Sequence, residues 1–287
     1  MLHIVTDGTA DFPTGWVEKY HIHVIPFHIH FGEESFLQNV DITEEDFYRL
    51  IAERRIIPKT SQLSPQQLEA VYTRIAEPGD TILSIHVGSK LSGTYASAVA
   101  AARKLADRIA VLPFDSAAGA AALAFMCKEA REMDTAGFPL EAIVRRLEAI
   151  RETVRVLLTI DTLDYARMSG RVKAIQAILA SLLQLKPIVE LKEGELIATG
   201  KVRSRIKALQ HVVQRAKEEM GKQLVDVAVV HARAPQDALR LAEMAKQALH
   251  IREMVTTSLS TAVTVHLGPR TAGLVVYPVE VGDAAVG

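Results

Sequence analysis

The chain has 287 residues, which favours about two domains, and its 49% hydrophobic and 23% charged residues are typical of a globular protein with a full core. Its 33 Lys and Arg nearly balance its 34 Asp and Glu, for a net charge of -1, which excludes a basic nucleic-acid clamp and an acidic disordered chain. The aromatic residues, 8 Phe, 6 Tyr and 1 Trp, leave no row of rings on which single-stranded nucleic acid could stack.

Membrane and disulfide chemistry are not expected from this sequence. Cys127 is the single cysteine, so an intrachain disulfide and a cysteine-based zinc cluster are excluded. The apolar run at 117–127 has 11 residues, whereas a membrane-spanning helix needs about 20. Residues 1–5 lack the basic start of a signal peptide. We therefore expect a cytoplasmic protein with no stable membrane insertion.

The first half of the chain alternates short aliphatic runs with amphipathic stretches. We predict strands at 2–5, 81–87 and 109–114, and an extended segment at 21–31 with a break or edge at Pro26. We predict helices at 43–54, from 65 onward, at 94–106 and at 117–133, with Thr43 capping the first and Ser64 capping the second. This alternation predicts a parallel sheet covered by helices on both faces.

The pattern changes after a strand predicted at 153–160. Two helical stretches follow in sequence, at 163–168 and 172–185, and then a hairpin with strands at 187–192 and 195–201 around Glu193-Gly194. A helix, a strand at 225–230, a second helix and strands at 254–258 and 273–277 complete the chain. We place a domain boundary within 160–172.

Four loops are expected at the carboxyl ends of the parallel strands, where ligands collect: 7–13, 58–65, 88–94 and 115–116. Gly88 and Gly93 have the spacing of a phosphate loop, but Thr94-Tyr95 follows where a nucleotide-binding loop needs Lys and then Ser or Thr. The sequence therefore argues against an NTPase. Ser92 and Gly93 are candidates to hold an anion at a helix start, and the alternative is that they only cap the helix.

Thr60 and Ser61 are further ligand candidates, because Ser64 alone suffices to cap the following helix. Their alternative role is a turn held by local hydroxyl bonds. For Asp7 and Asp11 we favour a strand-end turn and a helix cap ahead of Pro13.

The four histidines at 21, 23, 28 and 30 invite a metal interpretation. In a regular strand the first pair faces one side and the second pair the other, so all four converge only if Pro26 breaks the strand. We interpret them as half-exposed strand residues and predict no bound metal.

His266 and Arg171 are the last candidates. His266 precedes a Gly-Pro turn that could present it inward, and Arg171 follows Ser169-Gly170 at the proposed domain junction. The alternatives are a structural histidine and a solvated arginine at a helix end.

Taken together, these segments resemble the DegV family. The matching residues occur in the family's order over nearly the whole chain, at 7–13, 58–62, 89–95, 115–116, 169–171, 186–188 and 266–269. Three positions depart from the family's pattern: Gly8 stands where Ser is usual, Arg270 where a second Gly is usual, and 166–168 lacks the usual Lys-Gly pattern.

The resemblance implies an α/β protein of two domains. Residues 1–165 would form a Rossmann-like parallel sheet with helices on both faces, and residues 166–287 an α/β domain with a mixed sheet. One long-chain fatty acid, similar to palmitate, would lie in a tunnel between them. In bacteria such proteins present the acyl group to a separate fatty-acid kinase with a dihydroxyacetone-kinase-like domain, which makes the acyl phosphate, so the chain itself would not be an enzyme.

The physical chemistry agrees with this expectation. Burying about fourteen CH₂ groups at about 0.8 kcal/mol each gives a gross gain near 11 kcal/mol. A buried carboxylate needs donors, for which Thr60, Ser61, Ser92, Gly93 and His266 are our candidates, and a protonated His266 or Arg171 could neutralise it. Arg171 is also a candidate contact for the partner.

Two other classes remain open. The same helix N-termini would suit an enzyme acting on a small phosphorylated ligand. A transcription regulator is disfavoured by the lack of a basic patch and of a helix-turn-helix pattern. No cofactor is expected, with the fatty acid as the only ligand.

Overall fold

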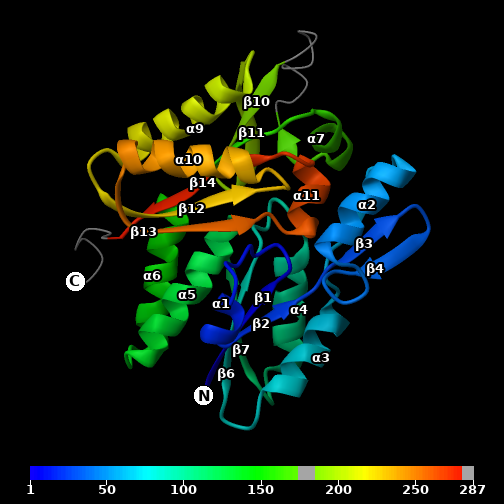
Figure 1. Cartoon of the computed structure of the whole chain (residues 1–287). Helices are drawn as coiled ribbons and strands as arrows, with labels where there is room; N and C mark the ends of the chain where they lie inside the picture. Colours follow the sequence, from blue (N-terminus) through cyan, green and yellow to red (C-terminus); the bar gives the residue numbers. More distant parts are fainter. Residues whose placement is uncertain (174–184, 280–287) are drawn as a thin grey trace.

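The computed structural model describes residues 1–173 and 185–279 (Figure 1). Its N-terminal part contains a four-stranded parallel sheet in the order β2-β1-β6-β7. The strands are β1 (Leu2–Asp7), β2 (Ile22–Ile25), β6 (Thr81–His86) and β7 (Ala110–Asp115). Helices α3 (Pro65–Ile75) and α4 (Thr94–Leu105) cover one face, and α5 (Ala121–Thr135) covers the other (Figure 1). The predicted parallel sheet with helices on both faces is confirmed.

Pro26 does interrupt the extended segment. The chain leaves the parallel sheet after β2 and enters a small antiparallel sheet in the order β4-β3-β5. Its strands are β3 (His28–Phe31), β4 (Glu34–Leu37) and β5 (Lys59–Ser61), and α2 (Glu44–Arg54) connects the last two. This sheet brings Thr60 to the edge of the parallel sheet.

The C-terminal part is built on a mixed seven-stranded sheet in the order β13-β12-β14-β8-β10-β11-β9. Its strands are β8 (Arg155–Thr159), β9 (Val172–Lys173), β10 (Lys186–Lys192), β11 (Glu195–Val202), β12 (Leu224–His231), β13 (His250–Ser258) and β14 (Ala272–Pro278). The hairpin β10–β11 around Glu193-Gly194 is confirmed. Helices α9 (Arg205–Met220) and α10 (Pro235–Ala248) cover the outer face of this sheet (Figure 1).

Strand β8 pairs with β14 and β10, so the second sheet takes a strand from residues before 160. A boundary between 165 and 166 would assign this strand to the N-terminal part, although its hydrogen bonds join it to the C-terminal sheet. One hydrophobic core also runs through both parts, from Ile4 and Phe125 to Val156 and Tyr277. The two sheets therefore share a common interior.

The helix caps predicted at Thr43 and Ser64 are confirmed. Thr43 accepts the amide of Asp46, and Ser64 and Gln67 form a complete capping box. The prediction of a helix from residue 117 was wrong, because Ala117 and Ala120 have φ of 49° and 59°, outside the helical region. Helix α5 starts only at Ala121.

Four further helices are α1 (Trp16–Lys19), α6 (Leu140–Thr153), α7 (Asp164–Ser169) and α11 (Thr261–Leu267). Helix α6 was not predicted from the sequence. The helix predicted at 172–185 was wrong at its start, since Val172 and Lys173 form β9, and its remainder lies almost entirely outside the described residues.

Candidate functional site: a cavity between the two sheets

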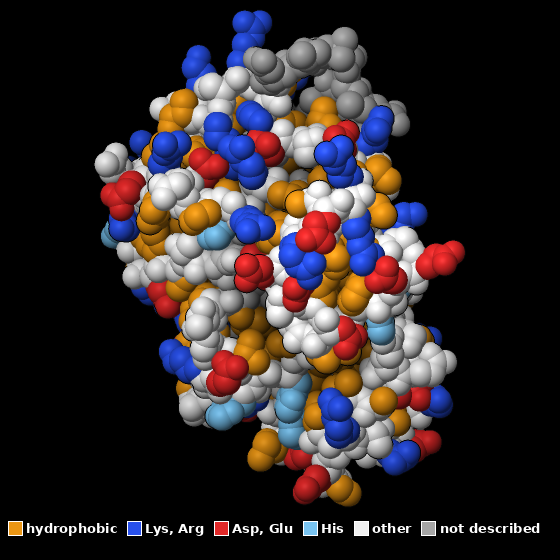
Figure 2. All heavy atoms as spheres, turned by 45° about the vertical axis from the view of Figure 1, so that its right-hand side comes forward, with side chains coloured by type: hydrophobic (Ala, Val, Ile, Leu, Met, Phe, Trp, Pro, Cys, Tyr) orange, Lys and Arg blue, Asp and Glu red, His pale blue; other side chains and the backbone are white. Residues whose placement is uncertain are grey.

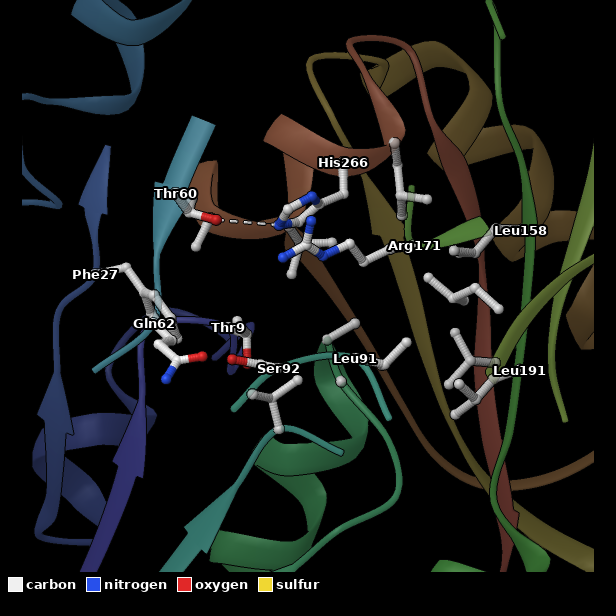
Figure 3. A pocket seen from close by; sticks show the side chains of 18 residues that line it. Thr9, Phe27, Thr60, Gln62, Leu91, Ser92, Leu158, Arg171, Leu191 and His266 are labelled. Carbon is white, nitrogen blue, oxygen red and sulfur yellow. Dashed lines mark hydrogen bonds between the residues drawn. The ribbon is translucent and has the colours of Figure 1, made fainter. Parts of the chain in front are cut away.

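A cavity of about 270 Å³ lies between the two sheets, just below the roughly 300–1,000 Å³ of typical ligand pockets (Figure 3). Its walls come from the carboxyl ends of the parallel strands, the antiparallel sheet, the inner face of the mixed sheet and α11. The lining residues sort into an apolar end and a polar end (Figure 3).

The apolar end is formed by aliphatic side chains: Leu91, Val156, Leu158, Leu191 and Leu196. Strand alternation places them, since Val156 and Leu158 on β8 face the cavity while Leu157 between them packs with α9 residues in the outer core. The hairpin β10–β11 adds Leu191 and Leu196, and Lys90 Nζ donates to the carbonyl of Glu193 at its turn, 2.8 Å away. This end of the cavity has the surface that an alkyl chain needs.

The polar end contains Thr60, Ser92, Arg171 and His266, four of the six predicted site residues. Thr60 Oγ1 and His266 Nε2 are 3.2 Å apart, so β5 and α11 meet at this hydrogen bond (Figure 3). The Nδ1 atom of His266 is buried and has no hydrogen-bond partner among the described residues. The His266 ring therefore lies on the cavity side of α11, and its role in binding stays a prediction.

From the sequence we considered either a protonated His266 or Arg171 as the positive charge that neutralises the ligand carboxylate. The structure does not favour a protonated His266. Burial, with the nearby Arg171 guanidinium, lowers the pKa of His266 to about 4. The ring is therefore neutral at pH 7 in this structure, and a protonated His266 is not the ready counter-ion of an anionic ligand. We assign the single ring proton to Nε2, because an N–H on the buried Nδ1 atom would be left without an acceptor in the part of the chain that the structure describes. In this tautomer His266 donates to Thr60 Oγ1 and leaves the Thr60 hydroxyl free to donate its own hydrogen.

Arg171 supplies the positive charge at the polar end. Its side chain reaches into the cavity toward His266 (Figure 3), while Nη1 donates to the carbonyl of Ser169 at 2.6 Å. Arg171 is exposed, and it also lines two further hollows beside the cavity. It can therefore face both a ligand in the cavity and a molecule outside it.

Ser92 and Gly93 occupy the start of α4. Ser92 Oγ lies 3.0 Å from Thr94 Oγ1 and accepts the Thr94 amide at 3.3 Å, so Ser92 also binds the first amide of the helix, whose N-cap is Gly93. Ser92 lines the cavity, whereas Gly93 lines only the neighbouring hollow. A Cβ on Gly93 would collide with the side chain of Gln62, another cavity residue.

The structure does not bring Ser61 to the cavity. Neighbouring residues of β5 face opposite sides, and Ser61 Oγ bonds His30 Nε2 at 2.5 Å on the side away from Thr60. Ser61 is therefore not a residue of the cavity.

Sequence reasoning missed Thr9, Gln62 and Phe27 as cavity residues. Thr9 Oγ1 donates to Asp7 Oδ1 at 2.6 Å, so toward the cavity it offers only lone pairs. Thr9 could have been predicted from its position in the loop after the first strand, but in that loop we considered only Asp7 and Asp11.

Asp7 organises the strand ends beneath the cavity. Its carboxylate accepts hydrogen bonds from Thr9, from the Val87 amide at 3.0 Å and from His86 Nδ1 at 3.0 Å. His86 Nε2 is in turn 2.8 Å from Ser84 Oγ. These partners hold the pKa of Asp7 below its ordinary value despite complete burial.

Two of the departures from the family pattern have local explanations. The space that a side chain at Gly8 would occupy is filled by Gln38, whose Nε2 donates to the Gly8 carbonyl at 2.9 Å. Arg270 has φ of 62°, a conformation that suits glycine, and Arg205 donates to its carbonyl.

The histidines near Pro26 do not converge. His23 lies on β2 beside His3, with ring centroids 5.6 Å apart, whereas His28 and His30 stack on β3 in a different sheet. Within residues 1–173 and 185–279 there is no group of three His, Cys, Asp or Glu that could hold a metal ion. The absence of a bound metal stays a prediction.

The face of the molecule in Figure 2 carries interspersed positive and negative side chains with apolar patches between them. Among the described helices, none has the length and apolar character to cross a membrane.

Comparisons with known proteins agree on one family. A family model described as "Uncharacterised protein, DegV family" matches residues 1–279. Protein DegV of Bacillus subtilis (strain 168) is 32% identical over 274 residues, which is 94% of this chain and 97% of that protein.

Solved structures give the same fold. A DegV family protein of Thermus thermophilus, described for its fatty acid binding, has a TM-score of 0.89 and 29% identity, and the match covers 96% of this chain and 99% of that one. A stearic acid-binding protein of Eubacterium ventriosum ATCC 27560 has a TM-score of 0.89 and 26% identity, with 97% and 98% covered.

Proposed function

The chain belongs to the DegV family, and from this premise we propose that it binds one long-chain fatty acid in the cavity between its two sheets. The observation that carries the proposal is the division of this cavity into an aliphatic end and a hydrogen-bonding end with one arginine. A fatty acid has the same division. The related proteins of Thermus thermophilus and Eubacterium ventriosum, which are described as binding fatty acids, support it.

The alkyl chain supplies the affinity. A palmitate-like chain of about fourteen CH₂ groups gains roughly 11 kcal/mol on complete burial, before the cost of immobilising it. The aliphatic residues at the far end of the cavity provide the surface for this burial.

The carboxylate would lie among Thr60, Ser92 and Arg171. Thr60 donates its hydroxyl hydrogen because His266 donates to its oxygen, and Arg171 brings the positive charge that a neutral His266 lacks.

We further propose that the chain is a carrier and not an enzyme. It would present the bound carboxylate to a separate kinase with a dihydroxyacetone-kinase-like domain, in the cytoplasm, and the kinase would transfer the phosphoryl group of ATP to a carboxylate oxygen. Arg171, exposed and lining both the cavity and the hollows outside it, is the residue best placed to meet such a partner.

Ligand titration tests the binding proposal. Displacement of a fluorescent fatty acid is measured with palmitate, with the C16 alcohol, and with octanoate. We expect palmitate to bind at least about tenfold more tightly than the alcohol, because only palmitate uses the charged site. Octanoate loses eight CH₂ groups and should bind far more weakly. Equal binding of all three would contradict the proposal.

The carrier proposal needs a second assay. The loaded protein is mixed with ATP and a fatty-acid kinase, and acyl phosphate is trapped with hydroxylamine. The trapped product should form only when both proteins are present. Product from the chain alone would show an enzyme.

A further inference from the structure

Asp11 joins the N-terminal part of the molecule to helix α11. Its Oδ1 accepts the amide hydrogen of Ser260 at 2.7 Å, across 249 positions of sequence. Ser260 is the N-cap of α11, and its own hydroxyl accepts the amide of Val263. Our sequence interpretation, in which Asp11 caps a helix after Pro13, was wrong, because the amide that it meets belongs to another part of the chain.

The position of this contact matters for the cavity. Helix α11 has only seven residues, and four of them, Ala262, Val263, His266 and Leu267, line the cavity. A helix this short has little stability of its own, so the contacts at its ends fix where it lies. Its first turn is held through Ser260.

The loop that carries Asp11 is itself well anchored. The Asp11 amide donates to the carbonyl of Ala120, a cavity residue, and the carbonyl of Phe12 accepts the hydroxyl of Thr257. Asp11 is 2% exposed. Asp11 can accept this amide hydrogen through Oδ1 whether its carboxyl group is ionised or is protonated on Oδ2, so the contact does not depend on its charge.

We propose that Asp11 is a positioning residue of the ligand site, which holds the start of α11 against the parallel-sheet part and thereby places His266 beside Thr60. The use of this placement for a fatty acid rests on the proposed function; the placement itself does not. Without the tie, α11 would shift, water would reach the His266 ring, and Thr60 would lose its hydrogen-bond partner.

Four variants separate the tie from its surroundings. Asp11→Ala removes the acceptor, whereas Asp11→Asn retains an oxygen that can accept the Ser260 amide. Ser260→Pro removes the donor, and the Ser260 backbone, with φ of -56°, suits proline. Ser260→Ala removes only the hydroxyl and retains the amide.

A fifth variant, Ser204→Ala, removes the N-cap hydroxyl of α9 on the outer face and is the control for the loss of a helix cap elsewhere.

Two measurements are made on each variant. Nuclear magnetic resonance of labelled histidine follows the titration of His266 without ligand, and displacement of a fluorescent fatty acid gives the affinity. In Asp11→Ala and Ser260→Pro we expect the His266 pKa to rise by at least about one unit toward its ordinary value as the ring becomes hydrated. We expect the affinity to fall at least about fivefold, as for the loss of one hydrogen bond.

Asp11→Asn, Ser260→Ala and Ser204→Ala should retain the wild-type titration and affinity. A His266 titration that is unchanged in both Asp11→Ala and Ser260→Pro would overturn the proposal. If Asp11→Ala does not fold, the two Ser260 variants decide. If the wild type binds no fatty acid, the proposed function fails, and the His266 titration still decides whether Asp11 positions α11.

Discussion

Thr60 and Ser61 are adjacent residues of β5 that face opposite sides, which makes them a matched pair for a test of the head-group site. Thr60→Val preserves the shape of the side chain and removes the donor, so fatty-acid affinity should fall by roughly 1.5–3 kcal/mol. Ser61→Ala loses only its contact to His30 and should bind like the wild type. Calorimetric titration with palmitate measures both. Equal losses in the two variants would remove Thr60 from the site.

Arg171 and Arg167 offer a second pair, since both are exposed and only Arg171 lines the cavity. Neither replacement by alanine should change the free energy of unfolding by more than about 0.5 kcal/mol. Arg171→Ala should sharply lower acyl-phosphate formation with the kinase, whereas Arg167→Ala should leave it unchanged. If affinity survives in Arg171→Ala and turnover falls, Arg171 serves the partner; if both fall, it serves the ligand. Wild-type values for both would show a solvated arginine.

Asp11 also gives the protein a specific pH dependence. Burial raises its pKa from 3.8 to about 7, and its Oδ2 has no hydrogen-bond partner in the described part of the chain. The groups that interact with it are Ser260 at the start of α11 and, on α2, Glu44 and Tyr48. Glu44 raises the Asp11 pKa further by repulsion.

The sign follows from proton binding. Between about pH 4 and pH 7 the folded state retains the Asp11 proton that the unfolded state has lost, so this group's contribution to stability falls as the pH rises. The shift of about three units corresponds to at most about 4 kcal/mol. Asp11→Asn has no titrating group at this position. The free energy of unfolding of the variant, relative to that of the wild type, should therefore rise from pH 4 to pH 8. Urea unfolding at both pH values measures the difference, and a constant difference would show that Asp11 is ionised throughout.

The sequence was a better guide to which residues line the cavity than to their charge states. Loop position identified Thr60, Ser92 and Arg171, because polar residues after parallel strands gather at one sheet edge. Thr9 and Gln62 were missed because nothing in their neighbourhood separates a cavity residue from a turn residue. The neutral state of His266 was not predictable either, because it depends on burial by segments far along the chain and on Arg171.

Among the secondary-structure elements, the local signals were reliable where a capping residue or a turn dipeptide was present. Thr43, Ser64 and Glu193-Gly194 predicted two helix starts and a hairpin correctly. The start of α5 was misjudged because 117–120 is apolar like the helix that follows. Its backbone is instead turned, with the carbonyls of Ala118 and Ala120 accepting the amides of Gly88 and Asp11. No sequence signal indicated that β8 leaves the N-terminal sheet, since hydrogen-bond partners far along the chain decide it.

The turn before α5 and the loop after β6 form a close backbone contact that can be tested. A Cβ on Gly88 would lie 2.9 Å from the carbonyl carbon of Ala117, closer than atoms approach without a shift of backbone. Gly88→Ala should therefore destabilise the fold by about 1–3 kcal/mol. Gly119→Ala is the control, because its nearest neighbour would be a Val87 methyl at 3.9 Å. Thermal unfolding measures both, and equal stability would show that the contact is not tight.

At the scale of the whole molecule, the cavity exists because the two sheets share one interior without filling it. The larger hydrophobic core extends from the parallel sheet to the inner face of the mixed sheet, and the outer face of the mixed sheet has its own core under α9 and α10. The two sheets are thus joined around the cavity by buried contacts, and the ties at Asp11 and Lys90 lie at its rim. A ligand that fills the cavity would therefore make packing contacts with both sheets at once.

The central claim, that this chain carries a long-chain fatty acid, is tested most directly by extracting lipid from the purified protein and identifying it by mass spectrometry. The account predicts a co-purifying fatty acid of about 14 to 18 carbons at close to one per chain, the length that can bury enough CH₂ groups to be retained. The Thr60→Val variant, purified in parallel, should retain less. A phosphorylated small molecule in place of the acid, or no acyl chain from a protein that also fails to bind palmitate, would contradict the account.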